Sequence, residues 1–159
     1  MATNKATLVG ELERIVQSDV EARQRAHREA AEAATHDEAR PENDKDTRAL
    51  EQSYLAGGEA RRVEEAMQGL ADIRALGTRA SSGENPVALG ALVTLVEGDQ
   101  TLVLLVAPYG GGARLDGGRV QVVTPRSPLG RAVLGHRVGD ECEVPASGRM
   151  RELYIQAVE

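Results

Sequence analysis

The first 80 residues carry the hydrophobic periodicity of long helices. From Leu8 onward, apolar or small residues recur at alternating spacings of four and three residues, which predicts the contact seam of a coiled helix. The seam positions are Leu8, Leu12, Ile15, Asp19, Ala22, Ala26, Glu29 and Ala33. Because Asp19 and Glu29 interrupt this seam and its far end is only alanine, we expect it to bury little apolar area.

A seven-residue repeat further along the chain predicts a second helix. Its members are Ala49, Ala56, Val63 and Leu70, with Ala66 and Ile73 repeating beside them. Alanine, glutamate, arginine and glutamine dominate this stretch, and all four favour helices. Each residue of the Gly57–Gly58 pair costs about 1 kcal/mol relative to alanine. We therefore expect a local bend or a loosened turn at this pair.

The segment HDEARPENDKD, residues 36–46, separates the two predicted helices. Pro41 cannot lie deep inside a helix, so the chain turns near it. Two helices joined by a short turn form an antiparallel hairpin. With about 29 residues in each helix and 1.5 Å per residue, the hairpin is an arm on the order of 40 Å long.

The second half of the chain has the pattern of short strands. Valine- and leucine-rich runs with turn residues between them predict strands at 91–96, 101–106, 119–123, 141–144 and 151–159. In the last of these, Leu153, Ile155 and Ala157 should face one side. Residues 127–135 predict a short helix that begins near Pro128 and ends at Gly135. The expected fold class is α+β, with a helical hairpin followed by a curved antiparallel sheet and one helix.

The composition changes near residue 80, and this change sets the domain boundaries. Residues 1–80 contain 12 Lys and Arg against 16 Asp and Glu, whereas five of the six prolines lie beyond residue 80. The sequence GTRASSGENP, residues 77–86, has the composition of a linker. We assign an arm at 1–78 with its tip near 37–46, a linker at 79–86 and a C-terminal domain at 87–159.

The overall composition excludes several classes of protein. The chain has 159 residues, a net charge of −6 and 2% aromatic residues, which argues against a basic nucleic-acid binder and against a base-stacking platform. A single cysteine, Cys142, excludes an internal disulfide, and we expect it to be a small core residue. No apolar run is long enough for a membrane span or a signal peptide, so we expect a cytoplasmic protein without membrane contact.

The predicted turn between the helices is rich in acids. Asp37, Glu38, Glu42, Asp44 and Asp46 lie within ten residues of one another. Carboxylates are the oxygen ligands that Mg²⁺ takes in proteins, and a bound Mg²⁺ activates water for phosphodiester cleavage. The alternative is that these acids are solvated and stabilise the second helix by lying near its N-terminus, which is the positive end of the helix dipole. The residue pattern leaves both interpretations open.

Three arginines, Arg126, Arg131 and Arg137, lie around the predicted short helix. They form either a modest basic patch or an ordinary charged surface. The glycine runs at 110–112 and 117–118 lack the Lys-Ser/Thr that follows a phosphate loop. We interpret them as turns between strands.

Residues 122–144, VVTPRSPLGRAVLGHRVGDECEV, closely resemble the C-terminal signature of the bacterial GreA/GreB transcript cleavage factors. The core of the match is SPLGRAVLGHRVGDE, residues 127–141. The order of an N-terminal coiled-coil arm, a linker and an α+β domain also matches. The resemblance implies an antiparallel coiled-coil hairpin followed by an FKBP-like domain.

The resemblance also implies a partner and a mechanism. Such factors dock at the secondary channel of bacterial RNA polymerase and place their arm near the catalytic Mg²⁺ and the backtracked RNA 3′ end. The polymerase then cleaves the RNA, so the factor is no enzyme itself and has no cofactor of its own beyond the shared Mg²⁺. We further expect a monomer with at most a weak contact to DNA.

The tip departs from the family pattern of an Asp and a Glu three residues apart. Glu42-Asn43 matches the Glu-Asn pair of the family, but Ala39 stands where the family has Asp. Glu38, Asp37 and Asp44 are the nearby acids that can take its place. The resemblance assigns metal binding to Glu42 together with one of these three. A regulator that binds the same channel without stimulating cleavage is the alternative.

By the same resemblance, Ser127, Pro128, Arg131 and Arg137 belong to the polymerase-docking region. Two other functions are weaker. A prolyl isomerase needs an aromatic pocket, and the C-terminal domain has only Tyr109 and Tyr154. An oligomerisation module needs a stronger seam than the arm provides.

Overall fold

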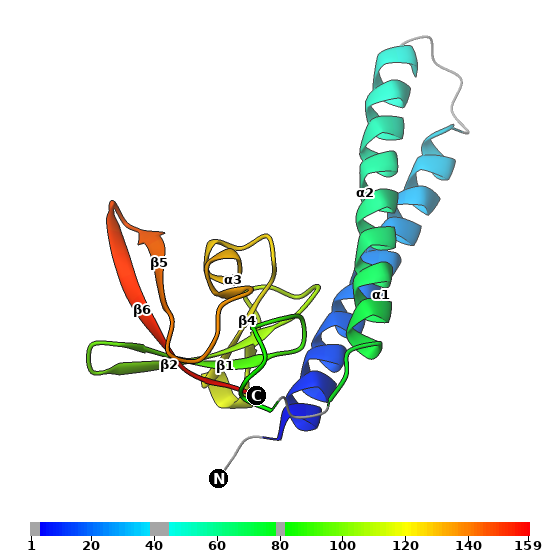
Figure 1. The fold of residues 1–159 in the computed structure, drawn as a ribbon. Coiled ribbons are helices and arrows are strands. Elements are labelled where there is room, and N and C mark those ends of the chain that lie inside the picture. Colours follow the sequence, from blue (N-terminus) through cyan, green and yellow to red (C-terminus); the bar gives the residue numbers. More distant parts are fainter. Residues whose placement is uncertain (1–3, 39–44, 79–81) are drawn as a thin grey trace.

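The computed structural model describes residues 4–38, 45–78 and 82–159, with side chains described outside 36–56. Helix α1 (Lys5–Glu38) and helix α2 (Lys45–Arg74) run antiparallel and form an arm that projects from the C-terminal domain (Figure 1). At 1.5 Å per residue, the 34 residues of α1 extend over about 50 Å. No helix in the described ranges is long and apolar enough to cross a membrane.

The buried stripe of α1 differs from the predicted seam. Leu8 and Leu12 are buried as expected, but Ile15 is 41% exposed, and Ala22 and Ala26 are exposed. The buried side chains are Leu8, Val9, Leu12, Val16 and Val20. This stripe packs against both α2 and the sheet of the C-terminal domain. The seam prediction was wrong at these positions because it assumed that α1 contacts another helix alone.

The predicted seam of α2 is confirmed where the structure describes it. Ala66, Leu70 and Ile73 are buried, and Val63 is half-buried. The helix continues without interruption through Gly57 and Gly58, which are exposed. The expected loosened turn does not interrupt the helix at this pair.

The C-terminal domain is a six-stranded sheet in the order β3-β4-β2-β1-β6-β5. The strands are β1 (Leu92–Glu97), β2 (Gln100–Val106), β3 (Arg114–Leu115), β4 (Val120–Val123), β5 (Glu141–Ala146) and β6 (Arg149–Val158). The α+β class is confirmed, but β2 and β4 are parallel, so the sheet is mixed and not purely antiparallel as predicted. Parallel neighbours need a crossover, and residues 107–119, which include the unpredicted strand β3, provide it.

A β-bulge in β6 changes which of its residues face the core, so the prediction for this strand was wrong at one position. Thr94 pairs with Ala157, whereas the next residue, Leu95, pairs with Ile155. The extra residue on β6 changes the alternation of its side chains. Leu153 and Ile155 are buried as predicted, but Val158 is buried in place of Ala157, which is half-buried.

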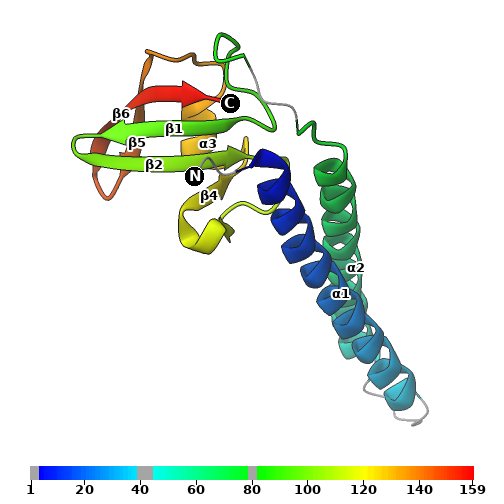
Figure 2. The same cartoon turned by 90° about the horizontal axis from the view of Figure 1, so that it is seen from below.

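Two apolar cores lie on the two faces of the sheet. One core joins the first turns of α1 and the end of α2 to β1, β2, β3 and β4. The other joins β1, β2, β5 and β6 to the short helix α3 (Pro128–Val133). Figure 2 shows α1 beginning beside the sheet and leading away from it. The base of the arm is therefore part of the domain's own core.

Candidate functional site

The predicted metal-binding tip falls largely outside the described residues. Helix α1 ends at Glu38, so Asp37 and Glu38 belong to its last turn, and α2 begins at Lys45. Glu42 and Asp44 lie outside the described residues, as do the side chains of Asp37 and Glu38. The assignment of these four acids to a shared Mg²⁺ stays a prediction.

Elsewhere in the described residues, no group of three or more His, Cys, Asp or Glu side chains is close enough to hold a metal ion. This finding covers the arm base and the C-terminal domain. It does not extend to the tip.

Helix α3 is capped by Ser127, the residue that precedes it. The Ser127 hydroxyl donates a hydrogen bond to the Thr124 carbonyl at 2.8 Å and accepts one from the Gly130 N–H at 3.0 Å. Such an N-cap satisfies a backbone donor that has no partner within the helix. Ser127 thus has a structural role within the predicted docking region.

Gly130 is required for this cap by its close contact with the preceding loop. A Cβ placed on Gly130 would lie 1.9 Å from the Thr124 carbonyl oxygen, a distance that no side chain tolerates. Pro128 suits the first helical turn, where its missing N–H costs nothing. The Ser-Pro-Leu-Gly segment is therefore explained in large part by the geometry of the turn into α3.

The remaining predicted docking residues lie on the surface around α3. Pro128 and Arg131 are exposed, and Arg131 is in the last turn of the helix. Arg137 is also exposed, but its guanidinium donates to the Glu84 carbonyl and its N–H donates to the Asp140 carboxylate. Arg137 therefore connects the loop after α3 to the segment that enters the domain, whereas Arg131 and Pro128 face solvent.

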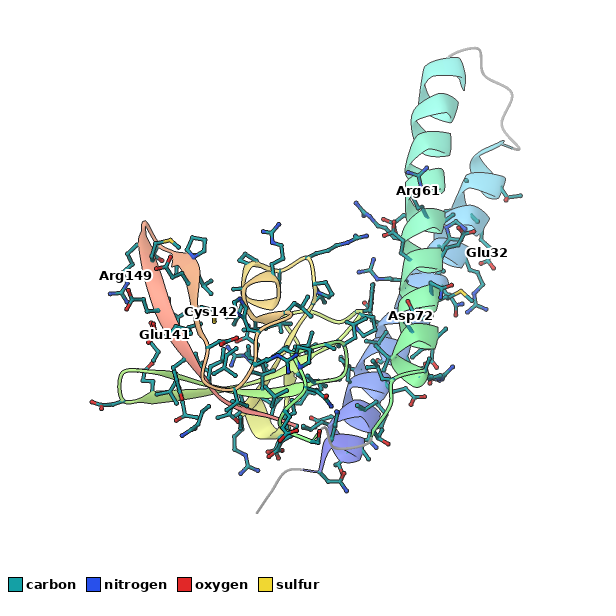
Figure 3. All side chains as sticks on the ribbon, viewed as in Figure 1. Glu32, Arg61, Asp72, Glu141, Cys142 and Arg149 are labelled. Atoms are coloured by element: carbon teal, nitrogen blue, oxygen red, sulfur yellow. The ribbon has the colours of Figure 1, made fainter. Side chains whose placement is uncertain are left out.

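A cleft of about 910 Å³ lies between the arm base and the C-terminal domain. Its arm wall includes Asp19 and Arg23 of α1 and Glu65 and Asp72 of α2. Asp72 is labelled in Figure 3. The domain wall is formed by the following residues: Leu89, Pro108, Tyr109, Gly110, Gly111, Ala113, Thr124, Pro125 and Arg126. The cleft thus reaches the loop that leads into α3.

The charges of the cleft are partly paired within the arm. Arg23 donates to Asp19 at 2.9 Å, and this hydrogen bond raises the pKa of the Arg23 guanidinium above its ordinary value. Gln68 donates to the Asp72 carboxylate at 2.9 Å. Each contact joins two residues of one helix, so it orders side chains on the arm wall of the cleft.

The contact between Tyr109 and Gly69 at this cleft was not found from the sequence. A Cβ on Gly69 would lie 2.3 Å from the Tyr109 Cγ, so the tyrosine ring lies directly on the backbone of α2. A lone glycine inside a strong helical repeat was the available signal, because such a glycine often marks a close approach.

Polar contacts also fix the base of the arm. The Asp116 N–H donates to the Glu11 carboxylate at 3.0 Å, and Lys5 Nζ donates to the Glu159 carbonyl at 3.3 Å. Between the helices, Arg74 donates to Glu13 at 2.7 Å. With the apolar core beneath them, these contacts set the direction in which the arm leaves the domain.

Comparison with protein families gives a match over the C-terminal domain. Residues 82–159 match the family described as "Transcription elongation factor, GreA/GreB, C-term". No curated protein matches the chain.

Solved structures with similarity to the chain include two Gfh1 proteins and a GreA/GreB protein. GreA factor homolog 1 (Gfh1) of Thermus thermophilus is 22% identical, with a TM-score of 0.41, over 92% of this chain and 94% of that one. Gfh1 of Thermus aquaticus is 22% identical, with a TM-score of 0.42, over 92% of both chains. A transcription elongation factor GreA/GreB from Nitrosomonas europaea is 19% identical, with a TM-score of 0.35, over 69% of this chain and 92% of that one.

Proposed function

Residues 82–159 belong to the GreA/GreB family of transcription elongation factors, and on this basis we propose that the protein acts on bacterial RNA polymerase and stimulates cleavage of backtracked RNA. The C-terminal domain docks at the entrance of the secondary channel. The arm then enters the channel and brings its acidic tip near the active site. The family match over the C-terminal domain is the observation that carries this proposal.

The length and the fixed base of the arm support this role. Helix α1 extends over about 50 Å, and its first turns are buried against the sheet. A tip held by a stiff arm on a docked domain reaches a site deep inside a partner. A loosely tethered arm would lose that placement.

The acids of the tip have the chemistry that Mg²⁺ prefers. Glu42 with Glu38, Asp37 or Asp44 supplies carboxylate oxygens, and Mg²⁺ usually takes one or two carboxylates and keeps several waters. When bound, such a metal activates water for attack on a phosphodiester. The role of this chain is to supply and orient the carboxylates.

The exposed surface of α3 supports docking. Pro128 and Arg131 face solvent on a helix held rigidly by the Ser127 cap. We assign the polymerase contact to this surface, with Arg131 as its charged member. Arg137 contributes by ordering the loop beside it.

A cleavage assay on a halted, backtracked elongation complex tests the proposal. The RNA is end-labelled, and the protein is added with Mg²⁺. We expect shortened RNA that the polymerase can extend again. Glu42→Ala should lose this activity, whereas Glu32→Ala, at an exposed acid lower on α1 (labelled in Figure 3), should keep it.

The same assay separates cleavage from simple occupation of the channel. The presence of Ala39 in place of the family's Asp favours a regulator that binds without stimulating cleavage. That alternative predicts slower elongation, no shortened RNA and little effect of Glu42→Ala. Slower elongation without cleavage would therefore contradict the proposed mechanism while keeping RNA polymerase as the partner.

A further inference from the structure

Helix α1 covers only part of one face of the sheet. The part of that face that β6 and β5 form is exposed to solvent. The arm base packs over β1, β2, β3 and β4, whereas β6 and β5 end the sheet on the far side (Figure 1). On this open face the cross-strand pairs are Glu141 with Tyr154, Glu143 with Glu152, and Pro145 with Met150. All six residues are exposed. We call these six residues the open face.

The open face combines three glutamates with two large apolar side chains. Tyr154 is 44% exposed and Met150 is 55% exposed, and both are among the large apolar side chains that the described residues leave in solvent. Tyr154 is also paired with the half-buried Val96 of β1. Aromatic residues and methionine are enriched in protein interfaces.

The open face also carries an uncompensated pair of like charges. Glu143 and Glu152 are directly opposite each other in the register of β5 and β6. The two arginines of β6, Arg149 and Arg151, belong to the other face by alternation, and Arg151 is paired there with Glu97. Like charges directly opposite in a sheet are destabilising. The free chain therefore bears a cost at this pair that a cation from a partner would remove.

We propose that the open face is a docking surface for a basic amphipathic helix of a partner protein. Lysine or arginine side chains of that helix would lie between Glu143 and Glu152. Its apolar side would pack on Tyr154 and Met150. The proposal does not depend on the proposed function, because it concerns a surface on the opposite edge of the sheet from the arm.

The charge of the open face and the way that helices cover sheets both favour a basic helix as the partner. A second copy of the chain, with its net charge of −6, is repelled by the glutamates, and so are the phosphates of a nucleic acid. A sheet face is stably covered by a helix or by a second sheet, and α1 already covers the other half of this face as a helix. A basic helix completes that layer with complementary charge.

A titration with synthetic helices tests the proposal. The probes are an amphipathic leucine–lysine peptide and a matched leucine–glutamate peptide, added to the ¹⁵N-labelled full chain. We expect the lysine peptide to shift the amide signals of β5 and β6, centred on Glu143, Glu152 and Tyr154. The glutamate peptide should leave these signals unchanged.

Two double variants carry the same loss of charge at different places. Glu143→Gln with Glu152→Gln should weaken binding of the lysine peptide about five- to tenfold. Glu29→Gln with Glu32→Gln, at exposed positions on α1, should change it less than about twofold. Tyr154→Ala should also weaken binding, because part of the contact is apolar.

Three results would overturn the proposal. The first is a set of shifts centred elsewhere, such as on the acids of α2. The second is equal weakening by the two double variants. The third is equal binding of both peptides. The amide spectrum of each variant without peptide reports whether it is folded, and conservative changes at exposed positions are expected to preserve it.

Discussion

Tyr109 of the C-terminal domain lies on the backbone of α2 at Gly69, so closely that a methyl group on Gly69 would be 2.3 Å from the Tyr109 Cγ. The next residue, Gly110, contacts helix α1 in the same way, because a Cβ on Gly110 would lie 2.8 Å from Leu12 Cδ1 of that helix. The residues after β2 thus contact both helices at the arm base. These contacts place the arm relative to the C-terminal domain, and they make the arm direction sensitive to single substitutions.

Gly69→Ala should destabilise the protein by about 2 kcal/mol, because the added methyl must displace the Tyr109 ring. Gly58→Ala is the matched control, since a Cβ there meets nothing within 4 Å and α2 is helical at that position. The control should stabilise the protein by up to about 1 kcal/mol. Thermal unfolding measures both, and equal effects would contradict the proposed packing.

The cap of α3 predicts that substitutions at two nearby positions lower the free energy of unfolding by different amounts. Ser127→Ala removes the hydroxyl that accepts from the Gly130 N–H and should cost about 1 kcal/mol. Gly130→Ala forces the Thr124 carbonyl away and should cost more, about 2–3 kcal/mol. Urea unfolding gives both values. A smaller loss for Gly130→Ala than for Ser127→Ala would be inconsistent with this turn.

The Glu97–Arg151 pair predicts an acid-dependent part of the stability. Arg151 donates two hydrogen bonds to Glu97, and these lower the pKa of the Glu97 carboxyl below its ordinary value. A lowered pKa in the folded state contributes stability above the unfolded-state pKa, and this contribution is lost as the pH falls through the folded-state value. We therefore expect the wild type to lose more stability than Glu97→Gln on acidification. Parallel curves of stability against pH would rule this contribution out.

The like-charged pair on the open face predicts a stabilising substitution. Glu152→Lys replaces a repulsion with Glu143 by an attraction across the strands. Cross-strand pairs contribute about 0.2–1 kcal/mol, so the unfolding midpoint should rise. The gain should shrink at high salt, because exposed charges are screened. A fall in the midpoint at low salt would mean that other contacts dominate at this position.

Cys142 should react slowly in the folded protein. It is 5% exposed, and burial raises the pKa of its thiol, with a further contribution from Asp140. The thiolate is the reactive form, so a raised pKa and burial both slow alkylation. Iodoacetamide at about pH 8 should label the chain rapidly in urea and slowly without it. Rapid labelling of the folded chain would place Cys142 outside the core.

The local pattern of the sequence was enough to predict the two long helices, most of the strands and the buried residues of α2. Alternation and helical repeats report which side of an element is apolar, and this holds before any partner is known. Pro128 likewise indicated the start of the short helix α3, because a proline suits the first helical turn.

Tertiary packing decided what the pattern left open. The buried stripe of α1 follows Val16 and Val20 and not Ile15 and Ala22, because the helix contacts a sheet as well as its partner helix. The parallel pairing of β2 with β4, and the bulge that buries Val158, depend on residues distant in the chain. The contact of Tyr109 with Gly69 joins two domains in the same way. Neither a repeat nor a spacing carries this information, since it arises only when separate elements share one core.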